Sequence, residues 1–173
     1  MAGRMSHPCL SSQTSSSGDL MEEYKRYNSE KYGISVDYPS GWKAEDGVEA
    51  MHLVAVFVPP AQPKAFRSSI NLIIEELPKQ LTLEEYTAAN IKQIQQKIVD
   101  NKIVSIDHLD LPCGEASELI YTGKIALQNG DCTWAQIYFV KGNRAYIFTS
   151  TSLKSESIYL QALNHMAGSL SIR

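Results

Sequence analysis

The sequence predicts an α+β protein, an α/β/α sandwich in which a central, mostly antiparallel sheet is flanked by helices. Three observations predict this class. Closely spaced turn signals in the second half of the chain join consecutive strands as hairpins, which makes those strands antiparallel. The register set by these turns makes both faces of the sheet apolar, so each face needs a cover. Two segments change to helical periodicity and can supply the two covers.

The composition is that of an ordinary globular domain, with 173 residues, 43% hydrophobic and 20% charged. We predict a disordered Ser-rich tail over residues 1–21, where apolar side chains are too few to offset the entropy of ordering, and one domain over residues 22–173. The net charge of −3 argues against nucleic acid as a partner, and no run approaches the roughly 20 apolar residues of a membrane helix. We expect a monomer without an integral membrane segment.

The stretch at residues 32–42 organises the start of the domain. Ile34, Val36 and Tyr38 alternate with small or polar residues, which is the period of a strand with one buried face. A proline and a glycine then signal a turn. Trp42 follows at once, so we expect its ring to cover the edge of the core.

The segments on either side of this strand are less regular until two apolar runs appear. Residues 20–31 fit a short strand followed by a turn, and a short helix over residues 20–27 is the alternative. Lys43–Met51 is predicted to be a polar connection. The apolar residues of His52–Val58 and of Ser69–Leu77 predict two buried strands, the first of them ended by a pair of prolines.

Two segments have the period of amphipathic helices. The first begins at the capping box Thr-Leu-Glu-Glu of residues 82–85, after which an apolar stripe continues for several turns. Asn90 lies in this stripe, either as a functional polar group or as a residue at the margin of the buried face. The second helix is predicted within Lys154–Leu170, with Ser152 or Ser155 as its cap.

Four strands lie between these helices, at about residues 103–109, 115–127, 132–141 and 144–151. Asn129-Gly130 and Gly142-Asn143 predict that the last two connections are tight turns. Such turns set Tyr121 opposite Tyr138 and Phe139 opposite Tyr146. One face then carries Tyr121, Ile125, Trp134, Tyr138 and Val140, and the other carries Ile120, Ile137, Phe139, Tyr146 and Phe148.

Residues that could carry chemistry are sparse. Cys113 and Cys132 lie far apart in this register, so we predict free thiols, and no Cys/His cluster suggests a metal site. Asp107 and His108 are neighbours in a strand and therefore point to opposite faces, which excludes a dyad. No phosphate-binding loop, nucleophile elbow or metal-binding helix motif is present. We predict no catalytic residue, no cofactor and no metal.

The candidate partner-binding loop is residues 59–68. It places Phe66 between the cations Lys64 and Arg67, an arrangement suited to recognition of a protein partner. The alternative is that Phe66 folds back onto the core. The polar connection at Lys43–Met51 is a second candidate surface.

The run Tyr-Gly-Ile-Ser-Val-Asp-Tyr-Pro-Ser-Gly-Trp at residues 32–42 resembles the start of PsbP-like domains. The order of elements is also similar, with N-terminal strands, a helix that opens with Thr-Leu-Glu-Glu-Tyr, an antiparallel run, and a C-terminal helix followed by a strand-like tail at Ser169–Ile172. The resemblance covers about residues 24–173. It implies membership of a superfamily that includes the bacterial lipoprotein DcrB and the Mog-type Ran-binding import factor, with an antiparallel sheet between helices.

The resemblance implies a non-enzymatic, PsbP-like protein-binding or assembly module. The plant member is a photosystem II subunit that helps retain calcium and chloride, but this chain has no clear lumenal targeting sequence, no metal-ligand cluster and no lipobox before Cys9. The alternative is a Mog-like regulator that binds a Ran-type small GTPase in nuclear transport, which an exposed acidic patch would favour. An enzyme ranks third and would need a deep pocket with convergent polar groups. We expect the chain in the cytoplasm or nucleus, with organellar import through the tail as an alternative.

Overall fold

The computed structural model describes residues 22–60, 66–125, 130–154 and 159–173. Its elements are β1 (Tyr24–Ser29), β2 (Ile34–Pro39), β3 (Lys43–Asp46), the 3₁₀ helix η1 (Glu49–Met51), β4 (Leu53–Val58), β5 (Ser69–Glu76), α1 (Leu83–Lys97), β6 (Val99–Leu111), β7 (Gly114–Lys124), β8 (Asp131–Lys141), β9 (Arg144–Leu153), α2 (Leu160–Ser169) and β10 (Ser171–Ile172). The predicted strands and both helices are therefore present. Within the described ranges, no helix is long and apolar enough to cross a membrane.

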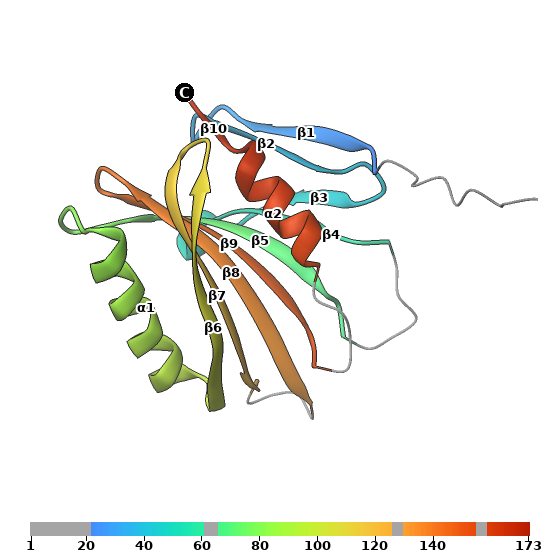
Figure 1. Cartoon of the computed structure of the whole chain (residues 1–173). Helices are drawn as coiled ribbons and strands as arrows, with labels where there is room; N and C mark the ends of the chain where they lie inside the picture. The colour runs from blue at the N-terminus through green and yellow to red at the C-terminus, as the bar shows by residue number, and fades with distance from the viewer. Residues whose placement is uncertain (1–21, 61–65, 126–129, 155–158) are drawn as a thin grey trace, which may run out of the picture.

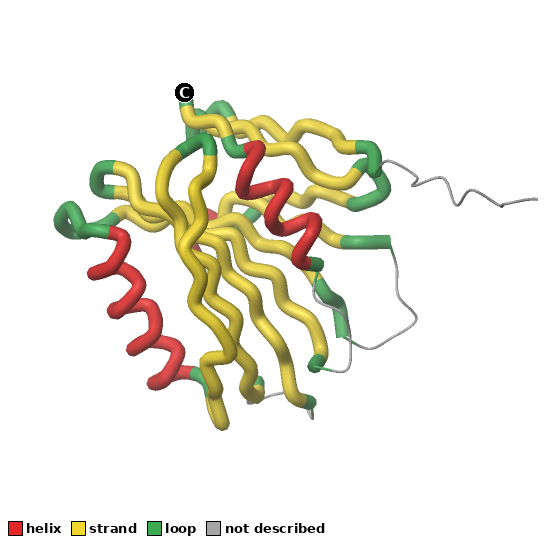
Figure 2. The backbone as a smooth tube through the Cα atoms, in the orientation of Figure 1, coloured by secondary structure: helices red, strands yellow, loops and turns green. Residues whose placement is uncertain are grey.

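The strands form two antiparallel sheets. The large sheet has the order β3-β4-β5-β9-β8-β7-β6, and the small sheet has the order β1-β2-β10. Helix α1 covers one face of the large sheet, whereas α2 and the small sheet lie over the other face (Figure 1). The backbone trace shows the two helices on opposite sides of the large sheet (Figure 2). This arrangement confirms the predicted sandwich and adds a second sheet to one of its covering layers.

The two faces of the large sheet belong to separate hydrophobic cores. The core on the α2 side contains Ile137, Phe139, Tyr146 and Phe148, and the core on the α1 side contains Tyr121, Trp134 and Tyr138. These are the two sets that the alternation of apolar residues predicted. Trp42 closes the α2-side core as expected, being 9% exposed, with its ring edge-on to Tyr159 at 4.9 Å between centroids.

The predicted register is right for one hairpin and wrong for the other. Phe139 pairs with Tyr146 as predicted, but Tyr121 pairs with Trp134 instead of Tyr138. A tight turn at Asn129-Gly130 would need β7 to continue past residue 124, whereas the last pair of this hairpin is Lys124 with Asp131. The resulting shift is four residues. Because that number is even, every side chain keeps its predicted face.

The N-terminal region contains more strand than its sequence indicates. Residues 24–29 form β1, which decides between strand and helix. Lys43–Met51 was expected to be a polar connection, but its first four residues form the edge strand β3, which pairs with β4, and η1 follows. An edge strand needs backbone partners on one side only, so β3 forms without an apolar run.

The two helices begin differently. In α1 the predicted capping box is present, because Thr82 Oγ1 accepts the amide of Glu85 at 3.1 Å and Glu85 Oε2 accepts the amide of Thr82 at 2.8 Å. In α2 the predicted cap is wrong: the N-cap is Tyr159, without a side-chain capping bond. Ser152 lies inside β9, where it pairs with Thr133 of β8, and Ser155 lies outside the described residues.

Candidate functional site

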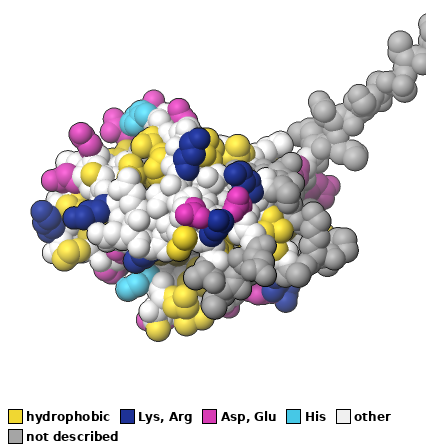
Figure 3. Space-filling view, turned by 90° about the horizontal axis from the view of Figure 1, so that it is seen from below, with side chains coloured by type: hydrophobic (Ala, Val, Ile, Leu, Met, Phe, Trp, Pro, Cys, Tyr) yellow, Lys and Arg dark blue, Asp and Glu magenta, His cyan; other side chains and the backbone are white. Residues whose placement is uncertain are grey.

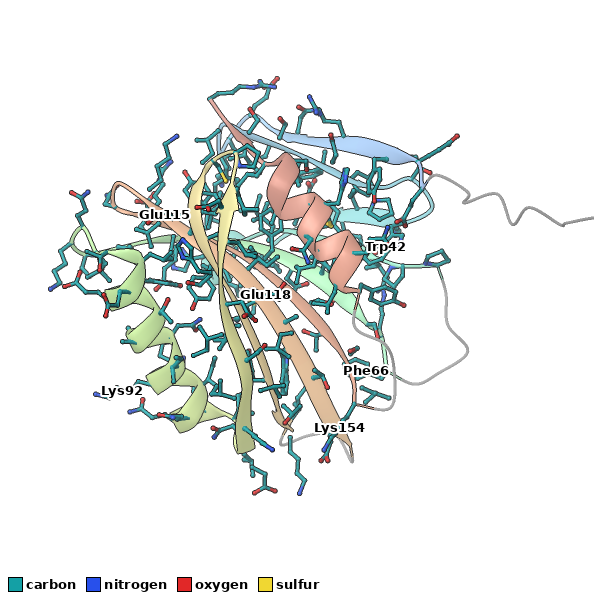
Figure 4. All side chains as sticks on the ribbon, viewed as in Figure 1. Trp42, Phe66, Lys92, Glu115, Glu118 and Lys154 are labelled. Atoms are coloured by element: carbon teal, nitrogen blue, oxygen red, sulfur yellow. The ribbon has the colours of Figure 1, made fainter. Side chains whose placement is uncertain are left out.

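The predicted partner-binding loop is only partly described. Lys64 lies outside the described residues. Phe66, labelled in Figure 4, is half-buried and packs against the α1-side core. Arg67 donates to Glu45 of β3 at 3.0 Å, and the hydrogen bonds from Lys43 and then from Arg67 hold the pKa of Glu45 below its usual range. Phe66 and Arg67 thus contact different parts of the protein, and their joint role in recognition stays a prediction.

The ribbons of α1 and β6 diverge from their junction (Figure 1). A groove lies between the N-terminal half of α1 and the hairpin end of β6 and β7. It encloses about 430 Å³. The residues that line it are Leu83, Glu84, Thr87, Ala88, Ile91, His108, Glu115 and Ser117. We call this cavity the α1–β6 groove. Its lining combines an apolar wall on the helix with polar and acidic groups on the strands.

Hydrogen bonds join α1 to the sheet beside the groove, and Thr87, which lines the groove, takes part in them. The hydroxyl of Tyr138, which is fully buried, donates to Thr87 Oγ1 at 3.0 Å, and Thr87 donates to the carbonyl of Leu83 at 2.9 Å. Asn90 donates to Gln136 Oε1 at 2.9 Å. Burial raises the pKa of Tyr138, so its phenol stays protonated as a donor. Asn90 therefore joins the helix to the sheet.

Two like-charged pairs lie across the hairpin of β6 and β7. Asp110 is directly opposite Glu115, and Asp107 is directly opposite Glu118. Like charges at opposed cross-strand positions destabilise a sheet. Among the described residues, no Lys or Arg forms an ion pair with any of the four; Asp110 meets only His108, at 3.8 Å. We call these four carboxylates the acidic hairpin.

The two pairs lie on different faces of the sheet. Glu115 lines the α1–β6 groove, as does His108, whose cross-strand partner Ser117 also lines it. Glu118 accepts a bond from Asn164 of α2 at 3.4 Å, so it lies on the α2 side, and Asp107 opposite it does too. This confirms that Asp107 and His108 point to opposite faces. In Figure 4, Glu115 and Glu118 come from the same strand, whereas Lys92 points outward from α1.

The acidic hairpin was missed in the sequence, although a signal for it exists. A two-residue turn at Pro112-Cys113 pairs Leu111 with Gly114, and the next pair is then Asp110 with Glu115. The face seen in Figure 3 shows no single charged patch, because acidic, basic and apolar side chains are interspersed on it. The unusual electrostatics are therefore local and depend on the register.

The described part of the chain contains no assembled metal site and no activated cysteine. No three His, Cys, Asp or Glu side chains there are placed to hold a metal ion together. Cys113 and Cys132 are free thiols, as predicted, and burial raises the pKa of each. A raised pKa leaves less thiolate at neutral pH, so neither cysteine is an activated nucleophile.

A second cavity of about 420 Å³ lies between the β1–β2 turn and the start of β4. Its main polar groups bond to each other: Tyr27 donates to Asp46 at 2.9 Å, and Lys31 pairs with Glu49. Burial and the bond to Asp46 raise the pKa of Tyr27 to about 12. Because these groups are already paired, this cavity is a weaker candidate than the α1–β6 groove.

Comparison with known proteins agrees with the fold. A model of the family described as PsbP-like protein matches residues 6–162. The Ran-binding protein Mog1p of Saccharomyces cerevisiae superimposes with a TM-score of 0.65 at 11% identity, over 87% of this chain and 96% of that one. The cyanobacterial PsbP (CyanoP) of Synechocystis sp. PCC 6803 gives 0.59 at 16% identity, over 90% and 96%. LpqN of Mycobacterium tuberculosis, involved in cell envelope biogenesis, gives 0.60 at 13% identity, over 89% and 92%. A search of curated proteins found no match.

Proposed function

The chain belongs to the PsbP-like protein family, and on that premise we propose that it is a non-enzymatic module that binds a protein partner at the α1–β6 groove and the acidic hairpin beside it. The observation that carries this proposal is the pair of opposed carboxylates Asp110 and Glu115, of which Glu115 lines the groove. Their repulsion costs stability and has no compensating Lys or Arg among the described ion pairs, whereas a cationic partner would relieve it.

The polar groups of the groove support binding rather than catalysis. Thr87, Ser117 and Tyr138 are engaged with each other or with the helix backbone. Ser117 lies directly across the strand pair from His108, but its hydroxyl lies 3.5 Å from Thr87 Oγ1, and the ion-pair contact of His108 is with Asp110. A catalytic set needs a nucleophile that is hydrogen-bonded to a neighbouring base, whereas the printed bonds of Thr87 and Ser117 in this groove go to other hydroxyls and to the helix backbone.

The test is capture of partners from the lysate of the source cells by the full-length chain, read by quantitative mass spectrometry. The decisive variant is Asp110→Lys/Glu115→Lys, because it reverses the charge while keeping two like charges opposed. The matched control is Glu23→Lys/Glu30→Lys, which makes the same two charge reversals at exposed positions before β1 and in the β1–β2 turn. We expect a partner captured by the wild type and the control to be lost at least tenfold with the double variant. A partner retained by the double variant, or none captured by the wild type, would contradict the proposal.

A second candidate is a regulator that binds a Ran-type small GTPase in the cytoplasm or nucleus. It is favoured by the likeness of the fold to Ran-binding Mog1p, together with acidic residues at the groove, where Glu84 of α1 joins Glu115. Capture in the presence of GTP or GDP tests it: recovery of a Ran-type GTPase that changes with the nucleotide supports this function. Arg67→Ala, together with Lys64→Ala, tests whether the predicted loop adds to the same contact.

A further inference from the structure

The strand that borders the groove is an edge strand of the large sheet. Among the described strands, β6 pairs only with β7, so its other edge has no strand partner there. Its two register irregularities are confined to the first part of the strand, between residues 99 and 105, and the pairing of Ser105–Leu111 with β7 is uninterrupted. In an antiparallel pair, alternate residues direct their N–H and C=O groups away from the partner strand. Over residues 105–111 these groups can therefore receive another strand.

This half of β6 lacks two of the usual protections of a sheet edge, bulges and proline, and its charged residues are Asp107 and Asp110, which repel acidic strands but not basic ones. Bulges and proline keep foreign strands away from an edge, but here the bulges lie earlier and the first proline is Pro112, beyond the strand. Ile106 is 49% exposed. Its cross-strand partner Leu119 belongs to the α1-side core, so Ile106 lies on the groove side. An added strand would find an apolar contact there and the wall of α1 beside it.

The negative charge beside the edge of β6 favours a basic segment as its partner. On the groove side, Asp110 and Glu115 are joined by Glu84, and no Lys or Arg lines the groove in the described part of the chain. On the opposite side, Asp107 faces Glu118. A second copy of this chain paired through β6 would bring more aspartates against the same edge. A segment carrying Lys or Arg would instead place opposite charges at cross-strand positions.

We propose that residues 105–111 of β6 receive an extended, basic segment of a partner protein as an eighth strand of the large sheet. This inference rests on the proposed function and specifies how the partner binds. Side chains at opposed positions share a face, so the segment carries an apolar residue beside Ile106 and a basic residue beside Asp110. On its other face, a second basic residue lies beside Asp107. Backbone bonds supply affinity, and the alternating side chains supply specificity.

The probe is the capped peptide Thr-Val-Lys-Thr-Val-Lys-Thr, with its reversed sequence to allow for either strand direction. Binding to the full-length chain is measured by NMR titration, together with amide hydrogen exchange of the complex. We expect exchange to slow at alternate amides of residues 105–111, and affinity to fall at least tenfold when the peptide lysines become glutamates. Methylation of the alternate peptide nitrogens that face β6 should abolish binding, and with it the protection, because it removes the donors to the β6 carbonyls and keeps the two backbones apart. The variant Asp110→Asn/Glu115→Gln should bind the lysine peptide more weakly with its fold intact.

The outcomes separate the inference from the proposed function. No binding of the lysine peptides, equal binding of the methylated peptides, or protection at the edge of β1 or β3 would each overturn strand addition at β6. If capture from lysate still depends on Asp110 and Glu115, the groove remains a binding site and only the mode of binding is wrong. If the peptide protects β6 but capture from lysate does not depend on Asp110 and Glu115, strand addition stands and the proposed function fails.

Discussion

The substitution Asp110→Lys should stabilise the fold, because the cross-strand register sets Asp110 directly opposite Glu115. The exchange removes one like-charge contact and adds one opposite-charge contact, each worth roughly 0.2–1 kcal/mol at such positions. The side chain of Asp110 is 89% exposed, so solvent screening places both values in the lower part of that range. We expect a gain of about 0.5–1 kcal/mol in the free energy of unfolding, which raises Tm by roughly 1–4 °C for a domain of this size.

The assay is thermal unfolding of the full-length chain at pH 8 and low ionic strength, with Asp110→Asn beside it. Asp110→Asn removes the repulsion without adding attraction, so its Tm should lie between those of the wild type and Asp110→Lys. In 1 M salt the Debye length falls to about 3 Å and the differences should shrink. A lower Tm for Asp110→Lys at low salt would refute the reasoning from the register.

Three further predictions test how α1 and the small sheet are held. Gly123→Ala would place a Cβ 2.3 Å from Ile98 Cγ2 and should lower the free energy of unfolding by about 1–3 kcal/mol in urea titrations. Gly168→Ala adds a Cβ in open space on α2 and should raise the same quantity by about 0.5–1 kcal/mol. Tyr138→Phe removes a buried donor and should lower the same quantity by about 0.5–1.5 kcal/mol; an unchanged value would mean that this bond does not hold α1. The pKa of Tyr27 is raised to about 12 in the folded state, against about 10 in the unfolded state. The contribution of Tyr27 to the free energy of unfolding is therefore fully present below about pH 10 and is lost as the pH rises through about 12. Urea titrations between about pH 10 and pH 12 should show a smaller loss of stability for Tyr27→Phe than for the wild type.

Sequence reasoning located the faces of the sheet more reliably than its register. Tyr121 and Trp134 were assigned to the correct face although the expected partner of Tyr121 was four residues away from the observed one. The face depends only on whether a residue is odd or even along the strand, and the hydrophobic pattern reports that directly. The register depends on the length of the connection, and Asn129-Gly130 suggests a shorter connection than the one between Lys124 and Asp131.

Edge strands were the other limit of sequence reasoning. β3, at Lys43–Asp46, carries no apolar run, and it is held in place by backbone pairing with β4. The cap of α2 was misplaced for a related reason, because β9 continues through Ser152 in register with β8 before the helix begins. In both cases the deciding interactions are backbone hydrogen bonds to a distant segment, which side-chain periodicity does not reveal.

The groove differs from the acidic hairpin in how far sequence can predict it. The pairing of Asp110 with Glu115 follows from one local turn, whereas the groove depends on the angle of α1 against the sheet. At its C-terminal end the helix meets the sheet at Gly123, where no Cβ separates the strand from Ile98. Towards its other end, the hydroxyl bond between Tyr138 and Thr87 holds the helix to the sheet. The helix and the sheet approach closely at the C-terminal end of α1, and the space between α1 and β6 widens towards the N-terminal half of the helix. That opening faces the hairpin end where the carboxylates are opposed, so the position of the groove and its charge have separate structural causes that meet at one place.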